Sequence, residues 1–126
     1  MWTDFIYNPR PILNLYQYDI PTLNKVKIEH ITLYDGHELM LTINLNKLPN
    51  PIPNRWRERE YNKSLVKLGF FHINEFELSG WNYDSFVEIN FSKENKTMFM
   101  EVNAEDYFIK CYFDQHISLR RIFGSK

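Results

Sequence analysis

The chain has 126 residues, of which 44% are hydrophobic and 25% are charged, and its formal net charge is −1. This length suits one hydrophobic core, so we expect residues 1–126 to form a single domain. A charge so close to zero excludes the uniform positive field that attracts phosphate backbones or anionic membranes, and we expect neither as a partner. Aromatic residues make up 17% of the chain; large rings suit pleated sheets, so the composition favours β structure.

The opening segment contains three prolines, which favour a loop with one short helix or turn: Pro9, Pro11 and Pro21. Residues 25–34 alternate between apolar and polar with a change of phase at Glu29–His30, which predicts a strand with a bulge. The dipeptide Asp35-Gly36 is typical of a tight turn, and a second alternation follows it. We therefore predict a β-hairpin over residues 25–46.

Three prolines at alternate positions between Leu48 and Trp56 predict an extended crossover connection without sheet hydrogen bonds. The next run, residues 55–60, alternates in charge and resembles a nucleic-acid patch, but its two glutamates weaken that interpretation. A solvated loop or short helix anchored by a buried Trp56 fits better. Residues 63–73 then predict one strand. Val66, Leu68 and Phe70 lie on one of its faces, and Phe71 and Ile73 lie on the other.

Residues 76–81 predict a further strand that ends at Ser79-Gly80. Residues 117–122 fit a last strand or a short helix. Between them lie three runs of period 2 separated by turn-forming residues, with these apolar positions: Val87, Ile89 and Phe91; Met98, Met100 and Val102; Ile109, Cys111 and Phe113. The sequence therefore predicts a mainly β fold, an antiparallel β-sandwich or strongly bent antiparallel sheet of about seven strands with little helix.

Residues that could carry chemistry are scattered. The four histidines form no closely spaced metal-binding pair, and the single cysteine, Cys111, excludes both an internal disulfide and a cysteine-rich zinc site. Cys111 lies in an apolar alternation, as a small buried hydrophobic residue would, and suits a reducing compartment. Neither a leader pattern nor a stretch of 18 apolar residues is present. We expect no catalytic residue, no metal, no cofactor and a cytoplasmic location.

Paired carboxylates such as Glu75 and Glu77 could suggest a glycosidase. That chemistry needs two carboxylates at a set separation across a cleft, which sequence neighbours seldom provide, so acidic loop ends are the preferred interpretation.

Acidic residues gather in the second half of the chain, where residues 75–114 carry nine of them against three lysines. If the apolar positions of the last three alternating runs face the core, the alternate positions point outward: Phe86, Glu88, Asn90, Phe99, Glu101, Phe108, Lys110 and Tyr112. Aromatic rings among mostly negative charge are typical of a protein-binding patch, although the N-terminal segment or a second sheet could cover these rings instead.

Several spaced features also resemble a known family. They are Ile20-Pro21-x-Leu23, Asp35-Gly36, Leu48-Pro49 with Pro51, Pro53 and Trp56, Tyr61-Asn62-Lys63 leading into Val66-x-Leu68-x-Phe70, Leu78-x-Gly80-Trp81, and Tyr107-Phe108-Ile109-Lys110-Cys111. In this order they resemble the bacterial immunity protein 50 family, from Pro21 to Ile122.

The resemblance implies a mainly β antidote, encoded beside a toxin of a polymorphic toxin system, that binds and neutralises that cognate toxin. An acidic patch would mimic the substrate of a toxin with a basic cleft and speed association. The candidate contact residues are Phe86, Glu88, Phe99, Glu101, Phe108, Lys110 and Tyr112, and the residues expected to define the fold are Trp56, Gly80, Trp81 and Cys111.

Two other classes of function remain open. A β-sandwich that binds a small ligand, such as a sugar or lipid, would have a concave site with exposed Trp or Tyr side chains. An enzyme with a dispersed site would bring at least two titratable groups with perturbed pKa values into one cleft.

Overall fold

The computed structural model describes residues 1–17, 19–35 and 37–126. This part of the chain forms two four-stranded antiparallel sheets, which confirms the predicted mainly β sandwich, with eight strands where about seven were expected. The strands are β1 (Lys27–Tyr34), β2 (Glu38–Asn44), β3 (Lys63–Phe71), β4 (Ile73–Ser79), β5 (Glu88–Glu94), β6 (Thr97–Asn103), β7 (Phe108–Asp114) and β8 (Ile117–Ser125).

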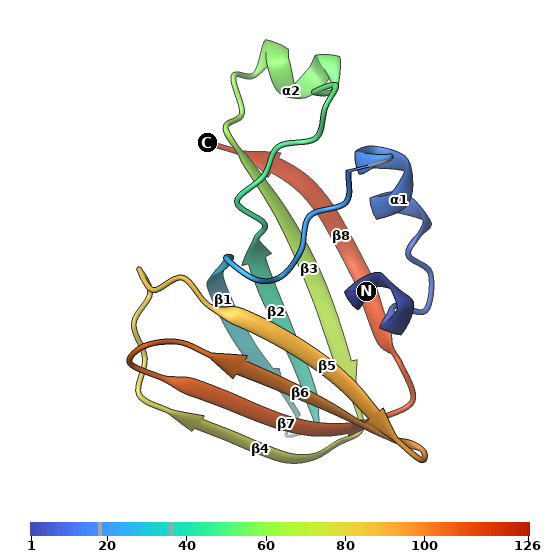
Figure 1. Cartoon of the computed structure of the whole chain (residues 1–126), viewed down its shortest axis with the longest axis vertical. Helices are drawn as coiled ribbons and strands as arrows, with labels where there is room; N and C mark the ends of the chain where they lie inside the picture. Colours follow the sequence, from blue (N-terminus) through green and yellow to red (C-terminus); the bar gives the residue numbers. More distant parts are fainter. Residues whose placement is uncertain (18, 36) are drawn as a thin grey trace.

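The first sheet has the strand order β1-β2-β3-β8, and the second has the order β4-β7-β6-β5. The chain passes from the first sheet to the second between β3 and β4, and returns between β7 and β8. Figure 1 shows the strands of the two sheets crossing at a large angle, with the upper ends of β3 and β8 extending beyond the second sheet.

The helices are short: the 3-10 helix η1 (Trp2–Phe5) and the α-helices α1 (Arg10–Tyr16) and α2 (Asn54–Glu58). Two hydrogen bonds fix the N-terminal segment in place. The Trp2 indole N–H donates to the Pro21 carbonyl at 2.7 Å, and the buried Tyr16 hydroxyl donates to the Lys47 carbonyl at 2.6 Å. The opening segment contains two short helices, η1 and α1, where one short helix or turn was predicted. None of the described helices has the length and apolar character needed to cross a membrane.

The predicted hairpin is confirmed as β1 and β2, and the predicted bulge is present because the pairing register shifts between Ile28 and His30. Of the predicted turn, Gly36 lies outside the described residues, while Asp35 has a φ of 49°.

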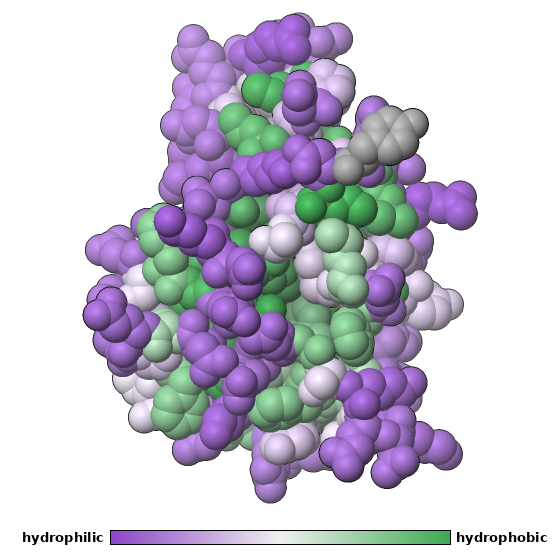
Figure 2. Space-filling model, viewed as in Figure 1, coloured by the Kyte–Doolittle hydropathy of each residue, from purple (hydrophilic) through white to green (hydrophobic). Residues whose placement is uncertain are grey.

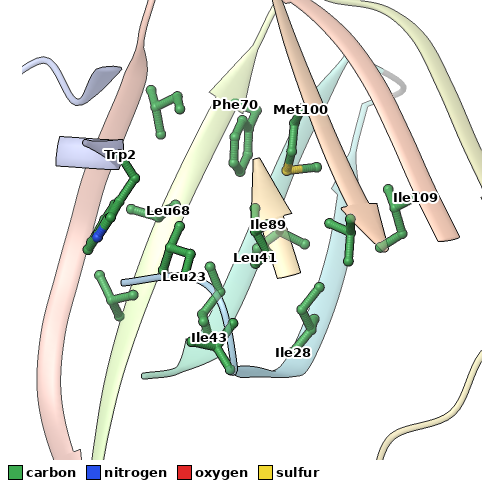
Figure 3. Packing of buried hydrophobic residues seen from close by; sticks show 14 of the residues in the cluster. Trp2, Leu23, Ile28, Leu41, Ile43, Leu68, Phe70, Ile89, Met100 and Ile109 are labelled. Carbon is green, nitrogen blue, oxygen red and sulfur yellow. The ribbon is translucent and has the colours of Figure 1, made fainter. Parts of the chain in front are cut away.

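One hydrophobic cluster lies between the sheets, and both sheets and the N-terminal segment contribute to it. Figure 3 shows side chains of the first sheet, such as Leu41 and Leu68, in one cluster with Ile89 and Met100 of the second. The Phe70 ring meets the Phe113 ring nearly edge-on, with centroids 5.1 Å apart, so this aromatic pair joins the two sheets.

The prediction of one strand over residues 63–73 is wrong. β3 ends at Phe71 in the first sheet and β4 begins at Ile73 in the second, with His72 between them at a φ of 54°. A left-handed residue at this point redirects the chain, and apolar residues on both sides of it hide the break in the sequence pattern.

The other predictions need smaller corrections. The strand predicted over residues 76–81 is β4, which begins earlier and ends at Ser79, as predicted. Residues 117–122 form a strand, which extends to Ser125. Trp56 lies in α2 and is only partly buried, where a buried ring was expected, because it packs over Gly124 at the exposed end of the molecule.

Candidate functional site

The outer face of the second sheet is the candidate site, and the burial pattern of β5, β6 and β7 creates it. On β6 the buried residues are Met98, Met100 and Val102, and on β7 they are Ile109, Cys111 and Phe113. Because side chains alternate across a strand, the residues between them point away from the core. The predicted inward and outward positions of these two strands are confirmed.

Strand pairing sorts the outward residues into rungs that cross the sheet. One rung holds Ser92, Phe99, Tyr112 and Glu75, the next holds Asn90, Glu101, Lys110 and Glu77, and the third holds Glu88, Asn103, Phe108 and Ser79. Six of the seven predicted contact residues lie in these three rungs, so the fold brings them together.

The face is predominantly acidic. Its outward positions include Glu75, Glu77, Glu88, Glu94, Glu101 and Asp114, whereas Lys110 is the basic residue that the strand register places among them. Lys110 lies in register between Glu101 and Glu77, and its ammonium nitrogen is 5.3 Å from the centre of the Phe108 ring. The face therefore has a negative field around one central cation.

Two aromatic rings form the apolar centre of this face. Phe99 and Tyr112 are opposite each other on β6 and β7, with ring centroids 4.6 Å apart, and the Tyr112 side chain is 40% exposed. They line an open hollow of about 300 Å³ at the hairpin end of β5 and β6. Partly exposed rings at the centre of a charged surface are the kind of anchor on which protein interfaces depend.

Phe86 lies apart from the other predicted contact residues. It precedes β5, and the ammonium groups of Lys25 and Lys27 lie 5.5 and 4.8 Å from the centre of its ring. It is 46% exposed. Lys25 precedes β1 and Lys27 is its first residue, so Phe86 lies at the border between the two sheets.

The interpretation of Glu75 and Glu77 as acidic loop ends is wrong, because both residues lie within β4. Glu75 pairs with Tyr112 and Glu77 pairs with Lys110, so both carboxylates extend the acidic face to the outer strand of the sheet. The alternation of β4 marks them as exposed, but their neighbours depend on the strand order, which the sequence does not reveal.

A hydrogen-bonded loop borders the face at its other end. The Asp106 carboxylate accepts hydrogen bonds from the Asn82 side-chain amide at 2.6 Å and the Ser85 hydroxyl at 2.7 Å. These two bonds, that from Asn82 first, lower the pKa of Asp106 below its usual value. They fasten the loop between β4 and β5 to the turn between β6 and β7.

Asp106 and its neighbour Tyr107 both have shifted pKa values and line the same open hollow. Burial, followed by the charge of Asp106, raises the pKa of Tyr107 to about 12. The Tyr107 ring is covered by Trp81, with ring centroids 5.0 Å apart. Both residues with a shifted pKa therefore make contacts that hold the loop between β4 and β5 against the turn between β6 and β7.

The residues expected to define the fold occupy three different environments. Cys111 is fully buried, and burial raises the pKa of its thiol to about 12. Gly80 has a φ of +75° and lies against the Asp106 carbonyl. Trp81 is 43% exposed, so it covers the turn from outside the core. Within the described part of the chain, no group of three or more His, Cys, Asp or Glu side chains is arranged to hold a metal ion.

A family model described as Immunity protein 50 matches residues 8–124 of the chain. Comparison with curated proteins and with solved structures gave no match.

Proposed function

Because the chain belongs to the immunity protein 50 family, we propose that it is a bacterial cytoplasmic antidote that binds and neutralises the cognate toxin of a polymorphic toxin system. The proposed contact surface is the outer face of the β4-β7-β6-β5 sheet, and the function is binding, without chemistry of its own. The observation that carries the proposal is the register of this sheet, which gathers six acidic side chains around the Phe99–Tyr112 pair.

The charge of this face suggests the chemistry of the toxin surface. Carboxylates on neighbouring rungs attract a basic surface over several ångströms and raise the association rate, while the aromatic pair supplies apolar contact once the surfaces meet. A toxin whose active-site cleft is basic, as in an enzyme that acts on a polyanion, would present the complementary surface. The antidote would then cover that cleft and exclude the substrate.

The opposite sheet offers a matched control because its outer face carries the opposite charge. Arg120 and Arg121 lie at the β8 bulge, are both exposed and flank Lys67, which pairs with Arg121. A charge reversal there changes the same number of charged side chains as one on the acidic face, but on a surface that the proposal leaves free.

The test is to measure association of the chain with the toxic domain encoded by the adjacent gene. The double variant Glu88→Lys and Glu101→Lys should associate about tenfold more slowly at low salt, because both carboxylates lie on the acidic face. The control variant, Arg120→Glu and Arg121→Glu, should associate at least as fast as the original protein. Equal rates for the original protein and the two variants, all with the original melting temperature, would exclude this face as the contact surface.

The alternative function is a module that binds a small sugar or lipid. The groove beside Trp2 and Phe5, with a volume of about 400 Å³, is the observation that favours it. The buried or partly buried rings of Trp2, Phe5 and Phe91 line this groove together with aliphatic side chains such as Leu23 and Ile89, so a lipid chain fits it better than a sugar.

A further inference from the structure

β5 is the edge strand of its sheet, and its free edge is the side that faces away from β6. Only part of this edge is paired. The backbones of Val26 and Val87 exchange two hydrogen bonds, of 3.2 and 2.8 Å, and the Ile89 N–H donates to the Leu23 carbonyl at 2.9 Å. The segment leading into β1 thus forms a short piece of antiparallel pairing on this edge. Beyond Ile89, no strand of the described residues lies on this side of β5.

The second half of β5 therefore has backbone groups without a strand partner on this edge, although η1 packs beside it through the Phe5 and Phe91 rings. In an antiparallel strand the N–H and C=O groups of every second residue point to the same edge. Since Val87 and Ile89 bond toward the free edge, Phe91 and Lys93 point their backbone groups there too. Among the described residues, neither forms a backbone hydrogen bond outside its own sheet. Such groups in line are a template for an added strand.

An apolar groove lies beside this edge. It has a volume of about 400 Å³, and its walls include Trp2, Phe5, Leu23, Ile89 and Phe91. The Phe5 and Phe91 rings are 6.0 Å apart between centroids. In Figure 2, hydrophobic residues gather just right of the middle of the view, beside a hydrophilic band, where Figure 1 shows the N-terminal segment next to β5. The groove has the size and character to hold one large apolar side chain.

We propose that the free half of β5 binds an extended segment of the toxin as an additional antiparallel strand, with one large apolar side chain of that segment in the groove. This inference rests on the proposed function, because the occupant is the toxin. The pairing of residues 23–26 on the same edge provides the geometry of such a strand.

The acidic face determines which partner fits. The outward side chains of β5, including Glu88 and Glu94, belong to that face, so a toxin that covers it also reaches the edge of the same strand. The carboxylates beside the edge favour lysine or arginine next to the apolar anchor of the incoming segment. One toxin surface thus makes both contacts, a basic patch on the face and a strand at its border.

The test uses a pair of variants at one position, with the toxic domain encoded by the adjacent gene as the probe. Lys93→Pro removes an N–H that points to the free edge and leaves the ladder with β6 intact, whereas Lys93→Ala keeps that N–H. The proline variant should bind about tenfold more weakly than the alanine variant, because the carbonyl of the incoming strand loses its donor. Amide exchange at Phe91 and Lys93 should slow in the complex of the original protein.

A second pair tests the groove and protects against a proline variant that fails to fold. Asn24 is exposed at the groove wall, so Asn24→Trp should fill the groove and weaken binding, while Asn24→Ala should bind as the original protein does. A toxin complex in which the Phe91 and Lys93 amides exchange freely, and in which both variant pairs bind equally, would overturn strand addition and leave the proposed function standing. The absence of any complex would overturn both.

Discussion

Replacing Gly80 by alanine tests how the end of β4 is held against the turn between β6 and β7. Gly80 has a φ of +75°, and an added Cβ would lie 2.6 Å from the Asp106 carbonyl oxygen and 3.2 Å from the Tyr107 Cβ. The left-handed conformation alone costs an alanine about 1–2 kcal/mol. Ordinary contact begins at 3.4 Å, so the turn must also move by roughly 0.8 Å. Because this turn carries the hydrogen bonds to Asn82 and Ser85, we expect a total loss of about 2–4 kcal/mol.

Gly69 provides the control. An added Cβ there would meet the Met40 sulfur at 3.1 Å and both the Arg120 Cδ and the Phe71 Cε2 at 3.3 Å, all of which are side-chain atoms rather than backbone. Gly69→Ala should therefore cost less than about 1 kcal/mol. Urea unfolding followed by tryptophan fluorescence measures both, and Gly80→Ala should lower the midpoint by about 1–2 M. Equal midpoints for the two variants would refute the argument that the Asp106 turn closes over this position.

Three further perturbations follow from the same contacts. Tyr16→Phe should destabilise the fold by about 1–2 kcal/mol, because the Lys47 carbonyl loses its donor, and urea unfolding measures this loss. Asp106 has a lowered pKa, so its contribution to stability is present above the ordinary carboxyl pKa and is lost as the pH falls through the lowered value. The Asp106→Asn variant should lack that acid-side loss when urea midpoints are compared across pH, and an unchanged profile would contradict the assignment. Trp81→Ala should cost about 1–2 kcal/mol, well below the value for a core tryptophan, because the ring is 43% exposed; a loss of 4 kcal/mol in thermal unfolding would contradict that position.

Where alternation alone decides burial, the sequence predicts the structure well. Met98, Met100 and Val102 are buried and Phe99 and Glu101 point outward, as the period of two requires. The same reasoning places the bulge near Glu29, because a phase change in the pattern has a direct physical counterpart in the strand.

Where one residue redirects the chain, the pattern fails. His72 separates two strands in different sheets, yet a histidine indicates a positive φ far more weakly than a glycine would. Strand order is equally hidden, so Glu75 and Glu77 could not be placed beside Tyr112 and Lys110 before β4 was known to pair with β7. The candidate site was thus predictable on β6 and β7 and not at its outer strand.

The most direct test of the central claim is to map where the toxic domain encoded by the adjacent gene contacts this chain, using backbone amide chemical shifts in solution. We expect the largest changes on β5, β6 and β7, around Phe99, Glu101 and Tyr112. A complex whose largest changes fall instead on the outer face of β3 and β8, around Lys67 and Arg121, would contradict it.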